Sequence, residues 1–217
     1  QATLRLLAAI RIPDRVRLPR AFDALVQHTT ASDLSTLLGE ENTFGVTYMQ
    51  GRADAAVEPG RDGLHVFNVR AYTAPIRAVP DLSFEFEYAL ERNGDALHSD
   101  AWTLGTAYQL SHIAWTPKIS YRYAFFRGDD VDTARNEAFD PLLPGFYDWG
   151  TWWQGEIAGE YFLSNSNLKS TLIRTDLEPS DALGLGVLLY KFSLDEPRAA
   201  GIRVTSSDLA VEADVYA

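Results

Sequence analysis

Apolar and polar residues alternate along most of this chain. The clearest alternation lies in residues 82–92, where Phe84 and Phe86 fall on one side and Glu85 and Glu87 on the other. A period of two is typical of a β-strand that has one apolar face and one wet face. The pattern therefore predicts a protein built from antiparallel β-sheet.

The same alternation predicts about ten strands and no convincing helix. Strands of soluble sandwiches usually run about 5–6 residues, so strands of about ten residues favour a barrel or a very large sheet. Residues 2–11 also suit a helix, because Leu and Ala favour one. Residues 182–194 are apolar on both sides, so the sequence does not decide which side chains share a face with the other strands' apolar residues. The expected strands are residues 2–11, 42–53, 64–74, 82–92, 99–111, 118–127, 148–163, 168–178, 182–194 and 207–217.

Residues 148–163 are the most aromatic of these segments. A period of two puts Trp153 and Tyr161 on an apolar face and Glu156 and Glu160 on a polar face. We therefore predict a strand here, with one face toward apolar surroundings and the other toward water.

Aromatic and charged side chains bear on whether the apolar faces meet a protein core or lipid. Tyr and Trp recur near the ends of these faces, as in the girdles of membrane barrels, and Trp149, Trp153 and Tyr161 are the predicted interface anchors. The opposite faces carry charges deep within strands, such as Lys118 and Arg122. Lipid outside a barrel accounts for both features, and a soluble antiparallel sheet with one wet face is the alternative.

The composition excludes several classes of protein. The 217 residues carry a formal net charge of −11, which argues against a nucleic-acid partner. The absence of cysteine excludes disulfides and thiolate metal sites. No run of about 18 apolar residues predicts a transmembrane helix, and no secretory signal pattern follows Gln1.

The chain shows no pattern of catalytic, metal-binding or cofactor-binding residues. The four histidines are scattered and fit no metal-ligand spacing, and no nucleophile elbow or phosphate loop appears. Glu156 and Glu160 would lie about 13 Å apart on one strand face, which is too far for glycoside hydrolysis. We therefore expect no enzyme, no cofactor and no metal.

A long aromatic-rich motif runs through the second half of the chain. It comprises Tyr121 to Phe126, Glu137 to Leu142, Pro144 to Tyr161, Ser164 to Leu168 and Tyr190 to Phe192. This motif resembles the alginate-export family of bacterial outer-membrane proteins over residues 100–194, and the resemblance extends loosely over the whole chain. It implies an eighteen-stranded antiparallel β-barrel that passes an anionic polysaccharide, such as a polyuronate, through a charged lumen.

About ten strands are too few for such a barrel. We expect one domain, residues 1–217, that forms an incomplete portion of an up-and-down transmembrane barrel in outer-membrane lipid, with strands missing at both ends. A general porin, a porin for acidic oligosaccharides and a soluble carbohydrate-binding sheet protein remain alternatives. The sequence identifies neither the direction of transport nor any periplasmic partner protein.

The polar faces predict which side chains line the substrate path. If residues 148–163 pair with 118–127, Arg122 faces Glu156 and Lys118 faces Glu160. The two contacts would be cross-strand ion pairs that stiffen the wall. Alternatively, Arg122 and Lys118 would contact a uronate carboxylate of the polymer as it passes. The lumen candidates are Arg70, Lys118, Arg122, Glu156, Glu160, Arg174 and Lys191.

The long polar connection at residues 128–147 is followed by Asp148-Trp149-Gly150, which is expected to form a turn and an aromatic anchor at the membrane interface. The alternative is that residues 128–147 fold into the lumen as a gate. Strict up-and-down alternation puts this connection on the rim opposite to connections 12–40 and 195–206. Each rim then has a long connection, so loop length does not identify the extracellular rim.

Overall fold

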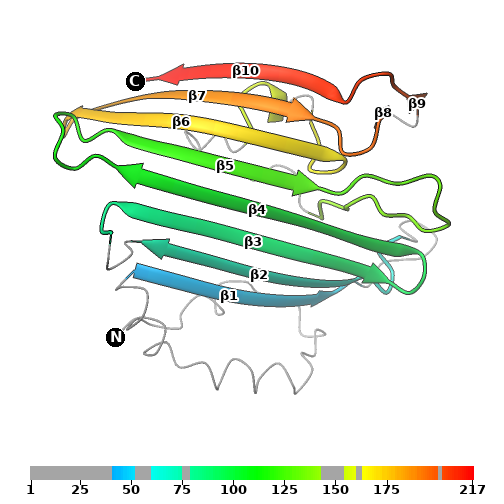
Figure 1. Ribbon diagram of the computed structural model, residues 1–217. Helices are drawn as coiled ribbons and strands as arrows, with labels where there is room; N and C mark the ends of the chain where they lie inside the picture. The colour runs from blue at the N-terminus through cyan, green and yellow to red at the C-terminus, as the bar shows by residue number, and fades with distance from the viewer. Residues whose placement is uncertain (1–40, 52–59, 75–78, 143–153, 160–162, 200–201) are drawn as a thin grey trace.

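Eight strands form one antiparallel sheet in the order β1-β2-β3-β4-β5-β6-β7-β10 (Figure 1). The computed structural model describes residues 41–51, 60–74, 79–142, 154–159, 163–199 and 202–217. The strands are β1 (Glu41–Gln50), β2 (His65–Ala74), β3 (Leu82–Asn93), β4 (Leu97–Gln109), β5 (Lys118–Phe126), β6 (Leu168–Ser180), β7 (Leu183–Ser193) and β10 (Asp208–Tyr216). A separate pair, β8 (Arg198–Ala199) and β9 (Ile202–Arg203), lies in the connection between β7 and β10.

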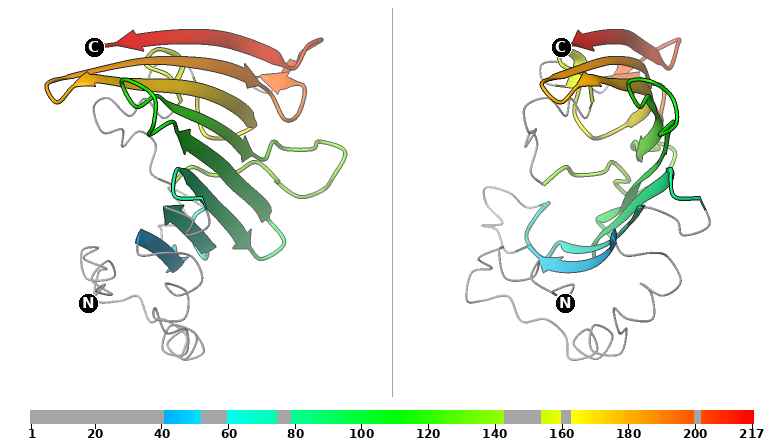
Figure 2. Two further views of the ribbon diagram at one scale, coloured as in Figure 1. Left: turned by 60° about the vertical axis from the view of Figure 1, so that its left-hand side comes forward. Right: turned by 90° about the vertical axis from the view of Figure 1, so that its left-hand side faces the viewer.

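The sheet is strongly curved and does not close on itself in the part of the chain that the structure describes. Figure 2 shows the strands following an arc from β1, in blue, to β10, in red. The predicted all-β class and antiparallel up-and-down order are confirmed, and the open arc is consistent with an incomplete barrel. Among the residues that the structure describes, there is no helix long and apolar enough to cross a membrane.

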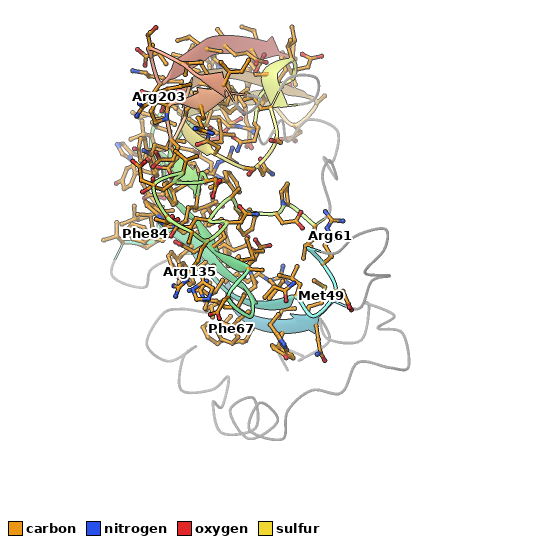
Figure 3. The ribbon with its side chains drawn as sticks, turned by 90° about the vertical axis from the view of Figure 1, so that its right-hand side faces the viewer. Met49, Arg61, Phe67, Phe84, Arg135 and Arg203 are labelled. Atoms are coloured by element: carbon orange, nitrogen blue, oxygen red, sulfur yellow. The ribbon has the colours of Figure 1, made fainter. Side chains whose placement is uncertain are left out.

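The convex face of the arc is apolar. In Figure 3, Phe67 and Phe84 point away from the concavity, whereas Met49 points into it. Because residues opposite one another in the register share a face, this confirms the facing predicted for strands β1 to β5 and β10. The convex face is a broad apolar surface of the kind that marks a lipid or protein contact. Large side chains that lie on this face, 40% to 78% exposed, are Phe44, Phe84, Phe86, Leu104, Tyr108, Ile119, Tyr121, Ile173, Val187, Leu189, Val211 and Val215.

The concave face has a polar half and an apolar half. Over β2 to β5 it carries charged and hydroxyl side chains, which alternate with the apolar side chains of the convex face. Over β6 and β7 it carries five large side chains of the core, all at most 5% exposed: Leu168, Leu172, Leu188, Tyr190 and Phe192. Ala158 packs in the same cluster, so a segment outside the sheet covers the apolar half.

That covering segment is residues 154–159, and it forms turns, so the strand predicted for 148–163 is wrong there. Gly155 has a φ of 86°, a left-handed conformation that an extended strand does not contain. The backbone N–H groups of Ile157 and Ala158 donate to the carboxylate of Glu212, at 2.8 and 2.7 Å, and not to a neighbouring strand. The alternation in the sequence therefore reflects a segment that packs inside the arc.

Several predictions fall outside the described residues. They are the first expected strand, residues 2–11, together with Trp149, Trp153, Glu160 and Tyr161. They stay predictions.

Because β5 pairs directly with β6, the connections divide between the two rims differently from the prediction. Between the described strands, one rim carries the connections 51–64, 94–96, 127–167 and 194–207, and the other carries 75–81, 110–117 and 181–182. The predicted division is wrong from residue 148 onward, because it assumed one strand too many. We call the first rim the long-connection rim.

Candidate functional site

Four of the predicted lumen bases lie on the concave face, namely Arg70, Lys118, Arg122 and Arg174. Their partners across the sheet fix this facing, because side chains opposite one another in an antiparallel pair share a face. Arg70 on β2, for example, lies opposite Glu87 on β3. The other three bases lie on the neighbouring strands β5 and β6.

These three bases line one hollow of about 310 Å³ over β3 to β6. Sequence reasoning did not bring them together, because the pairing of β5 with β6 spans the long connection 127–167. The hollow combines positive charge, two carboxylates and several hydroxyl groups, which suits a polar and acidic ligand. The polar side chains that face it from the concave side are Lys118, Arg122, Arg174, Glu85, Asp176, Tyr72, Ser83 and Ser120.

Arg174 is held by a local network. Its Nε lies 2.8 and 2.9 Å from the two carboxylate oxygens of Asp176, and its Nη2 donates to the Tyr216 hydroxyl at 2.8 Å. The hydroxyl of Tyr216 in turn donates to Asp176. The charge of Arg174 is therefore largely balanced within the wall.

Lys118 has a different environment. It is exposed and lies opposite Asp176, but that carboxylate is engaged by Arg174. Among the described residues Lys118 makes no ion pair or side-chain hydrogen bond. The predicted partner Glu160 lies outside those residues, and Lys118 is the base of the hollow whose charge faces the concavity.

Arg122 does not face Glu156, so that predicted pairing is wrong. It lies between Gly105 on β4 and Leu172 on β6. Glu156 is exposed on the segment 154–159, where Asp214 is a neighbouring charge. The prediction failed because it required a strand at 148–163 beside β5.

Lys191 is also placed wrongly by the sequence prediction, because it lies on the convex face. It is opposite Thr171 and Val211, and its Nζ lies 3.6 Å from Asp208. Strand β7 is apolar on both faces, since its concave face packs under the segment 154–159. Alternation alone therefore could not assign the facing of Lys191.

The segment 154–159, here called the inner segment, is fixed to the wall by polar contacts. Glu212 accepts the two backbone hydrogen bonds of Ile157 and Ala158, and the backbone of Gly155 hydrogen-bonds the Tyr190 hydroxyl. Gln154, the first residue of the inner segment, is fully buried. The inner segment therefore lies over β6, β7 and β10, and its described residues do not extend over the polar half of the concave face.

Residues 127–142, here called the strap, cross the concave side near the long-connection rim (Figure 2). Asp140 accepts two hydrogen bonds of 2.8 Å from the Arg61 guanidinium, which comes from the β1–β2 connection (Figure 3). The backbone N–H of Asp140 donates to Glu91 on β3 at 2.8 Å, and Ser99 donates to the Glu137 carbonyl at 2.7 Å.

The strap thus joins the end of β5 to β3 and to the β1–β2 connection on the far side of the arc. The sequence had indicated an inward fold of this connection as one alternative. It gave no sign of the partners Arg61 and Glu91, because they are distant in the chain and look like ordinary polar residues of a turn and a strand.

Aromatic rings gather on the convex face toward the long-connection rim. The ring centroid of Trp102 lies 5.2 Å from that of Tyr123 and 5.9 Å from that of Phe125. The side chains of Arg127 and Lys169 lie over the Phe125 ring, each at 5.9 Å. Such a mixture of rings and bases is typical of a surface that changes from apolar to polar.

Comparison with known proteins agrees with this architecture. A model of the alginate export family matches residues 13–208. A comparison with curated proteins found no match. An open wall of antiparallel strands, apolar outside and charged inside, together with a match over most of the length, shows that this chain belongs to the alginate export family.

Proposed function

We propose that this chain forms part of the wall of an outer-membrane channel that conducts an anionic polysaccharide, such as an alginate-like polyuronate. The observation that carries the proposal is the hollow in which Lys118, Arg122 and Arg174 meet on the concave face of a sheet with an apolar convex face. The proposal needs no covalent chemistry, because a polymer moves down its gradient through exchangeable contacts.

The charge arrangement supports weak contacts and not tight binding. Arg174 shares its charge with Asp176, and Glu85 lies near Arg122. Lys118 is exposed and can meet a uronate carboxylate directly. A site that is attractive enough to enter but too weak to hold its ligand is what conduction requires.

The apolar convex face supports contact with outer-membrane lipid. Its exposed Phe, Leu, Ile and Val side chains would be costly in water as one surface, and the rings of Trp102, Tyr123 and Phe125 suit the interface. Lys191 then lies at the polar border of the lipid-facing surface and plays no part in the substrate path.

The rims support an orientation in the membrane. Outer-membrane barrels have short periplasmic turns and longer extracellular loops. Between the described strands, the connections on one rim of the sheet are 75–81, 110–117 and 181–182. We infer that this rim faces the periplasm and that the long-connection rim, with the strap, faces the outside of the cell.

Replacement of Lys118 by serine should weaken the block of channel current by polyuronate about threefold, because one exposed charge contributes about 0.2–1 kcal/mol. The measurement is single-channel current of the full-length protein in planar bilayers with increasing polyuronate. Lys191→Ser is the matched control, since it removes the same charge from the convex face. Equal effects of both variants would contradict the assignment of the concave face to the polymer.

A further inference from the structure

Three glycines on the concave face each lie beneath a long side chain of the neighbouring strand. In each case the two residues are direct partners in the sheet register. The pairs are Gly45 with Arg70, Gly105 with Glu85, and Gly186 with Tyr216.

The best-defined pair is Gly105 on β4 with Glu85 on β3. A Cβ atom on Gly105 would overlap Cγ and Oε1 of Glu85 and would lie 2.7 Å from its Cδ. The Glu85 side chain therefore lies flat across β4, where a larger residue would stand. On the far side of Gly105, in the same row, lies Arg122, on which the Glu85 carboxylate acts electrostatically.

The same arrangement, a side chain that lies across a glycine of the neighbouring strand, occurs at β7. The Tyr216 ring lies across Gly186, and its hydroxyl accepts a hydrogen bond of 2.8 Å from Arg174 on β6. In both places a glycine in the middle strand lets a side chain reach an arginine two strands away.

At β1 the side chain that lies flat is basic. A Cβ atom on Gly45 would lie 2.9 Å from Nε and 3.0 Å from Cγ of Arg70. Arg70 thus leans toward β1 and away from Glu87, its partner on β3, which accepts a hydrogen bond of 2.7 Å from Asn68.

The backbone does not require glycine at these positions. Among the described residues, the glycines with positive φ are Gly63, Gly94 and Gly155, so the three on the concave face have an ordinary extended backbone. Glycine in a strand interior costs roughly 0.5–1 kcal/mol relative to alanine. What these glycines provide is space, whereas a Cβ on Gly184 of β7 would meet nothing within 4 Å.

We propose that Gly45 and Gly105 are specificity-determining positions of the channel, because each leaves a slot that holds a charged side chain flat against the wall. The slot at Gly105 keeps the Glu85 carboxylate beside Arg122 and out of the bore. The slot at Gly45 does the same for the Arg70 guanidinium. The inference rests on the proposed channel function, but it concerns small ions as well as the polymer.

Alanine at each slot should push the covering charge into the bore and change ion selectivity in opposite directions. In planar bilayers with a KCl gradient, Gly105→Ala should raise the permeability ratio of K⁺ to Cl⁻ roughly twofold, because a carboxylate then projects into the path. Gly45→Ala should lower the ratio by a similar factor, because a guanidinium projects. Gly184→Ala, where the added methyl group has open space, should leave it unchanged.

A double-mutant cycle shows whether Gly105→Ala changes the permeability ratio by displacing the Glu85 charge or by a general loosening of the wall. In a Glu85→Ser background, Gly105→Ala should no longer change the permeability ratio, because no charge is left to displace. An undiminished effect in that background, or a change of the same sign in Gly45→Ala and Gly105→Ala, would overturn the inference.

A crystal structure of Gly105→Ala gives a readout that needs no conduction. It should contain a Glu85 side chain rotated away from β4 over an unchanged backbone. A Glu85 side chain in its original place would also overturn the inference. Neither test uses polysaccharide, so failure of the polymer proposal and failure of the slots are distinguishable.

Discussion

Replacement of Glu212 by alanine is expected to release the inner segment and to increase the single-channel conductance about twofold. Glu212 accepts hydrogen bonds from the backbone N–H groups of Ile157 and Ala158, and alanine leaves both donors without this acceptor. Hydrogen bonds to a charged group contribute about 1.5–3 kcal/mol, and partial exposure reduces the total here to about 2 kcal/mol. The space over β6, β7 and β10 would then open to ions.

Two further variants make this result specific. Glu212→Gln retains one side-chain oxygen as an acceptor and should give an intermediate conductance. Asp208→Ala removes an acidic side chain from the exposed end of the same strand, where it lies 3.6 Å from Lys191, and should leave conductance unchanged. A wild-type conductance in Glu212→Ala would mean that the apolar packing of Ala158 and the hydrogen bond between Gly155 and Tyr190 are sufficient to hold the inner segment.

Release of the strap is the second large effect that the structure predicts. Arg61→Ala removes both hydrogen bonds of 2.8 Å to Asp140, and with them the contact between the strap and the β1–β2 connection. A partly exposed bidentate pair such as this one, with side chains 36% and 27% exposed, contributes about 1 kcal/mol. That energy corresponds to a roughly fivefold larger population of the released strap. Single-channel recordings should therefore contain longer openings or a new, larger conductance level.

The strap prediction has its own control and its own contradiction. Arg203→Ala removes an exposed arginine of the same long-connection rim, in β9, and should leave the recordings unaltered. Asp140→Asn should reproduce part of the Arg61→Ala effect, because the amide cannot accept both hydrogen bonds. Identical recordings from all three variants and the wild type would mean that Glu91 and Ser99 are sufficient to hold the strap.

Alternation was enough to predict the fold class and most of the facing. In β3, Phe84 and Phe86 lie on the convex face and Glu85 and Glu87 on the concave face, as their sequence order requires. In a strand with one apolar and one polar face, the local sequence determines which side chains lie on which face, because a shift of one residue would exchange the two faces. The wall could therefore be predicted from local sequence.

Alternation failed where one segment packs inside the arc. The inner segment alternates like a strand, but Gly155 breaks it and a carboxylate from β10 satisfies its backbone. Strand β7, which the inner segment covers, is apolar on both faces, so Lys191 was assigned to the wrong one. Both errors arise from a contact between residues more than 30 positions apart in the chain, which local periodicity does not contain.

The candidate site was predicted only in part for a similar reason. Arg70, Lys118, Arg122 and Arg174 could be assigned to polar faces, but their grouping depends on the pairing of β5 with β6 across the connection 127–167. A connection of that length leaves the register open. The glycine slots also could not be predicted from the sequence, because a glycine in a strand does not reveal which side chain covers it.

Current through the full-length wild-type protein in a planar bilayer, recorded with polyuronate and then with a neutral polysaccharide of equal chain length, tests the channel proposal most directly. The proposal predicts voltage-dependent interruptions of the current by polyuronate that weaken as salt is raised, since exposed charges are screened. It predicts no comparable interruptions by the neutral polymer. Equal effects of the two polymers would indicate a general porin, and an unaltered current with polyuronate would contradict conduction of an anionic polysaccharide.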